Sequence, residues 1–329
     1  MLRPRCSKSA VGNIVPINIM PGSLYRSLRS QLAKWRVAYY RAKPGFRARG
    51  KLVPFVTENE GNWILGDAII SGRPFVAARH GSTELACITD PRPEAFETLC
   101  GISGFFPLNH RLRDEFTRIY RDAAAEIDLL AAWNYRFGRF NEEEQLFRLQ
   151  QPSTRTIRLN SFNPFLFKEP WSQHLEGKDV LVVHPFSASI RSQYDSSRER
   201  LFADPRVLPR FRSLAIVQAV QSMGCFGGEF ETWFNALDHL KNQIDNHKFD
   251  IALIGCGCYG VPLAAHVKRL GRQAVHLGGA LQLLFGIKGR RWEDPTYGYD
   301  TRFYNEFWMR PLPEDVPRQR HDFEGAPYW

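Results

Sequence analysis

The sequence predicts an α/β fold built on a mainly parallel sheet with helices on both faces, and two observations carry that prediction. Short apolar runs alternate along the chain with helical patterns, which is typical of strands and helices wound into a parallel sheet. Residues 249–279 in addition read as a strand, a glycine-rich turn, a helix and a second strand, which together form a βαβ unit. At 329 residues and 43% hydrophobic content, the chain can bury a full core as one large domain or two small ones.

The expected elements before this unit follow one another at short intervals. Pro74–Arg79 reads as a strand, and Ser82 or Thr83 can cap the helix that follows it. Further along come a helix at 111–125, strands at 154–159 and 179–184, a polar helix through about 202, an apolar run at 214–220 and a helix at 229–246. The last helix is the clearest, because its large apolar residues form one stripe.

The βαβ unit itself contains a glycine fingerprint. Phe249–Ile254 is the first strand, and Gly255, Gly257 and Gly260 follow at G-x-G-x-x-G spacing. Pro262 can start the helix, Gly271 can end it, and residues 273–277 form the next strand. Glycines let a backbone approach a ligand closely, and a helix N-terminus offers free N–H groups to a phosphate. The turn therefore predicts a phosphorylated ligand, with a turn that only packs helix on strand as the alternative.

The end of the second strand argues against two common cofactors. NAD-binding proteins usually carry an acidic residue there to hold the ribose, and methyltransferases bind their cofactor ribose in a similar way. Here the strand ends in His276, Leu277, Gly278 and Gly279, with no acid. A dinucleotide-dependent oxidoreductase stays open as an alternative that this absence disfavours.

The candidate site residues follow the expected strands, because ligands of open parallel sheets bind beyond the carboxyl ends of the strands. After the first strand come Arg79, His80, Ser82 and Glu84. The other members of this rim are His184, Ser187, Ser189, Arg191, the glycine turn, His276, Gly278 and Gly279. Lys288, Arg290 and Arg291 form a cationic cluster that could neutralise a diphosphate. For each histidine alone, a hydrogen-bonded core residue is the competing interpretation, and for the cations a solvated loop.

The charge divides the chain into a basic arm, residues 1–50, and a nearly neutral α/β domain, residues 51–329. The arm holds eleven Lys and Arg and no Asp or Glu, which leaves −1 for the rest when the total is +10. Its apolar residues from Leu24 to Tyr39 share one helical face, so residues 20–50 suit an anionic membrane surface. A helix docked on the domain and a mitochondrial presequence are the alternatives. Nucleic acid is not expected as a partner, because the domain has no basic surface that extends the arm.

The remaining composition indicates a cytoplasmic protein. No apolar run reaches the 18 residues of a membrane span, and the start lacks a signal-peptide core. The six cysteines show no zinc spacing and are expected to be reduced. Residues 292–329 hold ten aromatics and five prolines, so we expect an ordered C-terminal strap rather than disorder.

Several segments together resemble the GT-D-type glycosyltransferases, a family found among bacterial polysaccharide-locus proteins. Arg79-His80-Gly81-Ser82-Thr83-Glu84 is similar to the Arg-x-Gly-Asp-Gly-Glu element of that family. The other matching segments are GFFP at 104–107, PWS at 170–172, residues 177–186, residues 254–271, residues 276–292 and the terminal Tyr328-Trp329. The resemblance spans roughly residues 70–329 and leaves out the basic arm. It implies a Rossmann-like fold, a nucleotide-sugar donor and a divalent metal, Mn²⁺ or Mg²⁺, held by an Asp-x-Glu pair. Ser82 replaces the first acid of that pair, so Glu84 would be the only acidic metal ligand.

The resemblance implies transfer of a sugar from a nucleotide-diphosphate donor to a glycan or lipid-linked acceptor in surface-polysaccharide synthesis. A UDP-sugar is the first candidate donor, and the expected location is the cytoplasm or the inner face of the membrane. In this interpretation Glu84 is the base or metal ligand, with Arg79 and His276 as the other catalytic candidates. The glycines at 255, 257, 260, 278 and 279 and the cationic cluster would bind the donor. A protein that binds nucleotide sugars without turnover is the alternative that Ser82 makes credible.

Overall fold

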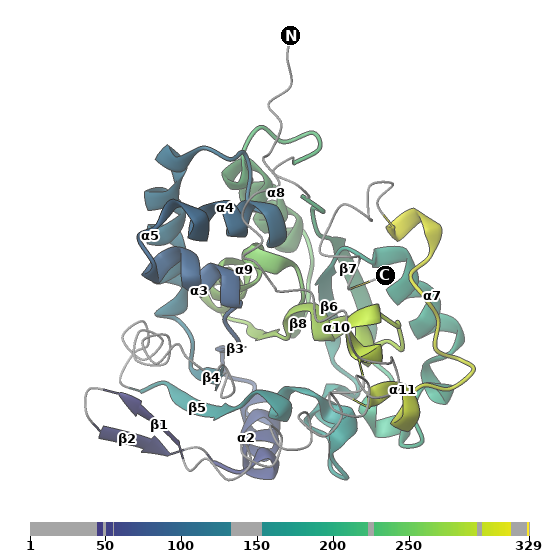
Figure 1. The fold of residues 1–329 in the computed structure, drawn as a ribbon. Helices are drawn as coiled ribbons and strands as arrows, with labels where there is room; N and C mark the ends of the chain where they lie inside the picture. The colour runs from purple at the N-terminus through teal and green to yellow at the C-terminus, as the bar shows by residue number, and fades with distance from the viewer. Residues whose placement is uncertain are drawn as a thin grey trace, which may run out of the picture.

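A seven-stranded parallel sheet forms the centre of the fold in the computed structural model of the chain (Figure 1). The structure describes residues 56–132, 153–222, 227–294, 298–316 and Tyr328, together with the backbone of 45–48 and 51–54. The strands lie in the order β5-β4-β3-β9-β8-β6-β7, and every neighbouring pair is parallel. The strands are β3 (Phe75–Ala78), β4 (Leu129–Ala132), β5 (Arg155–Arg158), β6 (Asp179–His184), β7 (Ser213–Gln218), β8 (Ile251–Ile254) and β9 (Gln273–His276). The α/β class and the parallel sheet expected from the sequence are confirmed.

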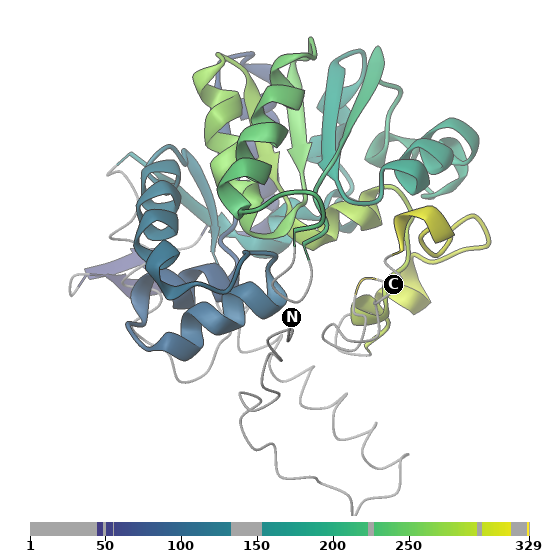
Figure 2. The same ribbon diagram turned by 90° about the horizontal axis from the view of Figure 1, so that it is seen from above.

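Helices cover both faces of the sheet, because successive residues of each strand point to opposite sides. In β6, Leu181 and Val183 belong to one core, and Val180 and Val182 belong to the other. The first core is covered by α3 (Ser82–Thr89), α4 (Pro93–Ile102), α5 (Arg113–Ala124), α8 (Trp233–Asp245) and α9 (Gly260–Arg269). The second is covered by α2 (Glu58–Ile70), α7 (Ser187–Ser196), α10 (Leu281–Leu284) and α11 (Tyr299–Arg302). Figure 2 shows the yellow C-terminal segment on the opposite side of the molecule from α3–α5.

Some elements differ from the sequence prediction for local reasons. Helix α8 begins at Trp233 instead of 229, because Thr232 caps it by accepting the Asn235 N–H. The helix after β6 ends at Ser196, and a 3₁₀ turn follows. Helix α2 was not predicted, although Thr57 and Glu60 form a capping box at its start. Helix α4 and strand β4 were also missed, and no glycine or proline separates β4 from the helix before it.

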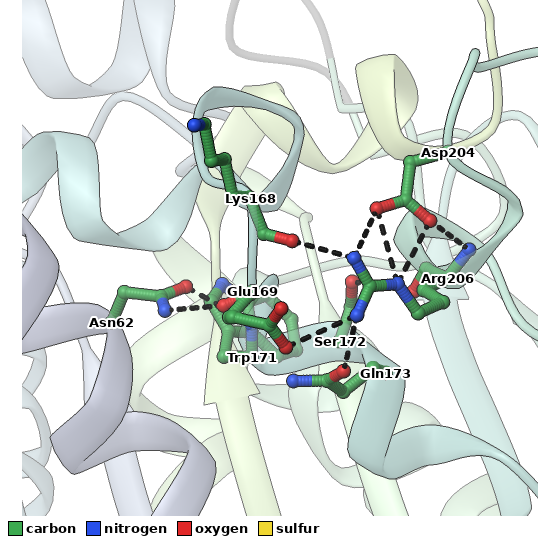
Figure 3. Close-up of polar contacts among 8 residues, drawn as sticks. All are labelled: Asn62, Lys168, Glu169, Trp171, Ser172, Gln173, Asp204 and Arg206. Atoms are coloured by element: carbon green, nitrogen blue, oxygen red, sulfur yellow. Dashed lines mark hydrogen bonds and ion pairs between the residues drawn. The ribbon is translucent and has the colours of Figure 1, made fainter.

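The PWS segment at 170–172 joins α2 to the second core (Figure 3). Asn62 of α2 donates to the Glu169 carbonyl at 2.7 Å and accepts the Trp171 N–H at 2.9 Å. Arg206 binds the two residues just before this segment by donating to the Lys168 carbonyl at 2.7 Å and to Glu169 Oε2 at 3.1 Å. Because Trp171 is 1% exposed, this part of the resemblance is structural and lies in the core.

The described part of the predicted C-terminal strap is ordered on the second core. Asp315, which is 2% exposed, accepts the N–H groups of Ala188 and Ser189 at 3.3 and 2.7 Å. The Ser189 hydroxyl also donates to Asp315 at 2.6 Å. The start of α7, a candidate ligand site in the sequence, is therefore bound to a carboxylate of the chain itself.

The region before α2 contains a two-stranded hairpin of β1 (Gly45–Ala48) and β2 (Lys51–Pro54). This hairpin crosses residue 50, the expected end of the arm. The rest of the arm, and its predicted amphipathic helix, lies outside the described residues. Within the described parts of the chain, no helix is both long and apolar enough to cross a membrane.

Candidate active site

The carboxyl ends of β3 and β9 bring the first candidate residues together. Ala78 pairs with His276 in the sheet, so Arg79 and His80 follow β3 directly beside the end of β9. The positive charge of Arg79 acts on both other candidates: it opposes the burial that raises the pKa of Glu84, and it adds to the burial that lowers the pKa of His276. A Cβ at Gly278 would lie 3.4 Å from Arg79 Nη1. The three catalytic candidates therefore share one region with the Gly278 turn.

Glu84 lies in the first turn of α3, and its carboxyl group folds back towards Gly81. The Thr83 hydroxyl donates to Glu84 Oε2 at 2.8 Å, and the Thr83 and Ser103 hydroxyls contact each other. The residue is 5% exposed, and burial raises the pKa of its carboxyl. A raised pKa brings a carboxyl closer to the range that a general base needs. The same hydrogen bonds also suit an acid that only stabilises the helix start.

Gly81 is required for this conformation of Glu84. A Cβ at Gly81 would collide with the Glu84 carboxyl group. The backbone of Gly81 is extended, with φ of −76°, so an alanine there would cause no backbone strain. Its only effect would be the collision of its methyl group with the Glu84 carboxyl.

His276 is neutral and fixed in one tautomer. Burial and the neighbouring Arg79 lower its pKa to about 3. Its Nδ1 lies 3.2 Å from the Ile254 carbonyl, which can only accept, so Nδ1 carries the proton and Nε2 is an acceptor. With this pKa the ring is a weak base, and it suits hydrogen bonding to a hydroxyl better than proton abstraction.

His80 and His184 are core histidines with other partners. Burial lowers the pKa of each to about 3. Nδ1 of His80 lies 3.1 Å from the Tyr120 hydroxyl. Nδ1 of His184 accepts the Phe186 N–H at 3.0 Å, so its remaining nitrogen carries the proton. His184 is therefore poorly placed to act as a base.

The glycine fingerprint lies between β8 and α9, as predicted, but each glycine faces protein. A Cβ at Gly255 would lie 2.6 Å from the Gly278 carbonyl, and one at Gly260 would collide with the His276 ring. Gly257 has φ of +56°, and a Cβ there would lie 2.6 Å from the Ser103 carbonyl. That carbonyl also accepts the Cys258 N–H at 3.1 Å. The loop at 101–107 therefore occupies the side of the turn on which the phosphate was expected.

The last candidates lie beyond β9 and meet the C-terminus of the chain. Gly279 contacts the ring of Tyr328, and Arg291 donates to the Tyr328 hydroxyl at 2.9 Å. The side-chain amino group of Lys288 lies 5.7 Å from the centre of the Tyr304 ring. The backbone N–H of Lys288 donates to the Met309 carbonyl. Arg290 is exposed on the short 3₁₀ helix that also carries Arg291.

A divalent metal finds no suitable set of ligands around Glu84. In the described ranges, no group of three or more His, Cys, Asp or Glu side chains is arranged to hold an ion. The Glu84 carboxyl already accepts a hydrogen bond from the Thr83 hydroxyl, and Ser82 replaces the acid that the resemblance would supply. Hard divalent ions prefer several oxygen ligands with carboxylates among them. The residues present do not fit a protein-held metal site.

Sequence reasoning missed Ser103 and Tyr120 as members of this region. Ser103 joins the Glu84 hydrogen bonds to the glycine turn, and Tyr120 of α5 contacts His80. The two glycines of GISGFFP were the available signal for a loop that approaches other backbone closely, but the backbone that it meets, at Cys258, is more than 100 residues away.

Three solved structures are similar to this chain at low sequence identity. The first is a selenomethionine-substituted structure of the domain of unknown function 1792, with 14% identity and a TM-score of 0.41, covering 78% of this chain and 96% of the other. The second is described as a new glycosyltransferase with that domain from Streptococcus sanguinis, with 12% identity, a TM-score of 0.40 and coverage of 70% and 84%. The third is described as having a distinct glycosyltransferase fold, with 16% identity, a TM-score of 0.40 and coverage of 82% and 94%. A scan of protein families and a search of curated proteins find no match.

Proposed function

We propose that this protein is a glycosyltransferase that moves a sugar from a nucleoside-diphosphate donor to a hydroxyl of a glycan or lipid-linked acceptor in surface-polysaccharide assembly. A UDP-sugar is the first candidate donor. One observation carries the proposal: the pairing of β3 with β9 places Arg79, the start of α3 with Glu84, and His276 at one carboxyl edge of the sheet, where Arg79 also lies against the Gly278 turn. This edge is where ligands bind in parallel α/β folds.

The proposed reaction needs a base and a cation, and this region offers both. The acceptor hydroxyl attacks the anomeric carbon of the donor sugar, its proton passes to the Glu84 carboxylate, and the bond from that carbon to the diphosphate breaks. Arg79 stabilises the negative charge that develops on the leaving diphosphate. The neutral His276 accepts a hydrogen bond from a sugar hydroxyl at Nε2. The raised pKa of Glu84 makes its carboxylate a stronger base than an exposed glutamate.

The donor diphosphate is proposed to lie outside the Gly278-Gly279 turn, facing Lys288, Arg290 and Arg291. Arginine suits this role because its planar donors match phosphate oxygens. The fingerprint glycines would then act indirectly, since Gly260 makes room for His276 and Gly257 makes room for the loop of Ser103. No step is assigned to a divalent metal, because the residues around Glu84 do not fit one.

The basic arm is proposed to bring the enzyme to an anionic membrane surface, where a lipid-linked acceptor would be found. Its eleven cationic side chains carry this proposal, at roughly 1 kcal/mol for each one near the surface. Deleting residues 1–44 should abolish cosedimentation with anionic liposomes, and full-length protein that never cosediments would refute the idea.

A non-catalytic protein that binds nucleotide sugars is the second candidate. The observation that favours it is the enclosure of the Glu84 carboxyl by Thr83 and Ser103, which is also expected of a structural acid. Binding of a nucleoside diphosphate without release of UDP or GDP from any sugar donor would select this alternative.

Glu84→Gln tests the enzymatic proposal with little change in side-chain size. Release of UDP from UDP-sugars should fall by about 10²–10⁴-fold, the usual contribution of a general base. Glu94→Gln is the matched control, because Glu94 also lies in the first turn of a helix but has an exposed side chain. The control should keep full activity.

A binding panel separates the candidate ligands before any activity is known. Thermal shifts should be measured with UDP, GDP, NAD and S-adenosylmethionine, with and without Mn²⁺, because a ligand that binds the folded state stabilises it. A shift with UDP or GDP supports the proposal, and a shift with NAD alone selects an oxidoreductase. If Glu84→Gln retains full activity, Glu84 only stabilises the helix start.

A further inference from the structure

The C-terminal Tyr328 contacts the part of the chain to which the donor diphosphate is assigned. Its hydroxyl accepts a hydrogen bond from Arg291 Nη1 at 2.9 Å. The guanidinium carbon of Arg291 also lies 4.7 Å from the centre of the Tyr328 ring. One aromatic side chain thus contacts Arg291 through both its hydroxyl and its ring.

Tyr328 is itself held by buried parts of the domain. Its carbonyl accepts from Gln282 Nε2 at 3.1 Å, and Gln282 is fully buried. Its ring lies against Gly279, where any Cβ would collide with it, and 5.9 Å from the ring of Trp292. The same Gln282 amide donates to the carbonyls of Ile287 and Lys288. The cationic cluster and the end of the chain are therefore held by common contacts.

These contacts decide how Arg291 can bind an anion. A free arginine side chain loses much conformational freedom when it is immobilised, and that loss weakens binding. A hydroxyl and a ring that hold the guanidinium beforehand remove part of this cost. Gly279 has a second role, since only a residue without a side chain lets the Tyr328 ring approach this turn.

We infer that Tyr328 is a positioning residue that orients Arg291 towards the diphosphate of the donor, close to the Gly278-Gly279 turn. The inference rests on the proposed function, because it assigns a diphosphate to this cluster. It predicts that Tyr328 contributes to the preference for a nucleoside diphosphate over the corresponding monophosphate.

The test compares the affinities of the full-length protein for UDP and UMP by calorimetry. Tyr328→Phe keeps the ring and removes the hydroxyl, so the preference for UDP over UMP should fall by about 2–10-fold, the net value of one hydrogen bond. If Tyr328 had only a structural role, its substitution would lower the affinities for UDP and UMP equally and leave their ratio unchanged. Tyr194→Phe on α7 is the matched control, because it also removes one tyrosine hydroxyl that accepts a hydrogen bond, in this case from the Phe211 N–H. It should leave the UDP-to-UMP ratio unchanged.

A double-mutant cycle assigns the effect to Arg291. In an Arg291→Ala background, Tyr328→Phe should change the UDP-to-UMP ratio no further, because the partner is already gone. An unchanged ratio in Tyr328→Phe, or an equal loss with and without Arg291, overturns the role of Tyr328 while the donor site stands. A wild-type protein that binds UDP no better than UMP overturns both the inference and the proposed diphosphate site.

Discussion

Gly257→Ala is the substitution that most directly tests how the glycine turn is built. If the turn served a phosphate, a methyl group there would affect ligand binding and would cost no stability beyond the strain of the left-handed backbone. In the structure the methyl group would instead point at the Ser103 carbonyl, at 2.6 Å. Carbon and oxygen atoms in ordinary contact lie about 3.3 Å apart or more, so the loop must retreat by about 0.7 Å.

The expected loss of stability has two parts. A residue with a side chain at φ of +56° costs about 1–2 kcal/mol, because left-handed backbone brings Cβ close to the following carbonyl. Displacing the Ser103 loop adds about 1–3 kcal/mol, as in other overpacked sites. The free energy of unfolding should therefore fall by about 2–5 kcal/mol in total.

Urea unfolding followed by tryptophan fluorescence measures this loss, and a second glycine separates the two parts. Gly271 also has a positive φ, +79°, but nothing lies within 4 Å of the position its Cβ would take. Gly271→Ala should thus show the backbone cost alone. Equal losses in the two variants would refute the proposed contact with Ser103. Loss of UDP binding in Gly257→Ala, with a loss of stability no larger than that of Gly271→Ala, would restore the phosphate interpretation.

Two further predictions concern the histidines and the C-terminal segment. The free energy of unfolding should fall as the pH drops from about 6.5 to about 3. Burial lowers the pKa of three histidines to about 3, namely His80, His184 and His276. These side chains stay neutral in the folded protein over this pH range, whereas in the unfolded chain they take up protons below about pH 6.5. Each histidine can lower the free energy of unfolding by up to about 1.4 kcal/mol per pH unit. Glu84 partly opposes this loss, because its raised pKa favours the folded state as the pH falls. Urea midpoints that do not change from pH 7 to 5 would contradict the prediction. Asp315→Asn should lower the free energy of unfolding by about 1–3 kcal/mol and speed proteolysis of the C-terminal segment, because a buried carboxylate that binds the start of α7 is lost. The exposed Asp300→Asn should change neither measurement, and equal proteolysis of both variants would show that Asp315 does not hold the segment.

The strands that could be predicted are those whose residues alone specify burial. Asp179–His184 contains four consecutive apolar residues, and it forms β6 at the predicted residues. The turn between β8 and α9 was found because its glycines have a fixed spacing. Strand β4 could not be found in this way, because its leucines and alanines suit a helix equally well and no glycine or proline separates them from the preceding helix.

The candidate site divides in the same manner. The rule that ligands bind at the carboxyl ends of parallel strands selected Arg79, Glu84 and His276 from the sequence, and the pairing of β3 with β9 brings these residues together. Ser189 was selected by the same rule, yet it binds Asp315, a residue 126 positions away. No local pattern marks a partner at that distance.

The sequence by itself determined the fold class, the glycine turn, the basic arm and the set of polar residues at the strand ends, because these depend on short-range periodicity and spacing. Only the tertiary structure decided what each of these groups contacts. Gly257 faces the loop of Ser103 instead of open space, and Tyr328 returns from the end of the chain to Arg291. Both outcomes depend on which distant segments pack together, and that packing is set by the whole core rather than by the residues near either site.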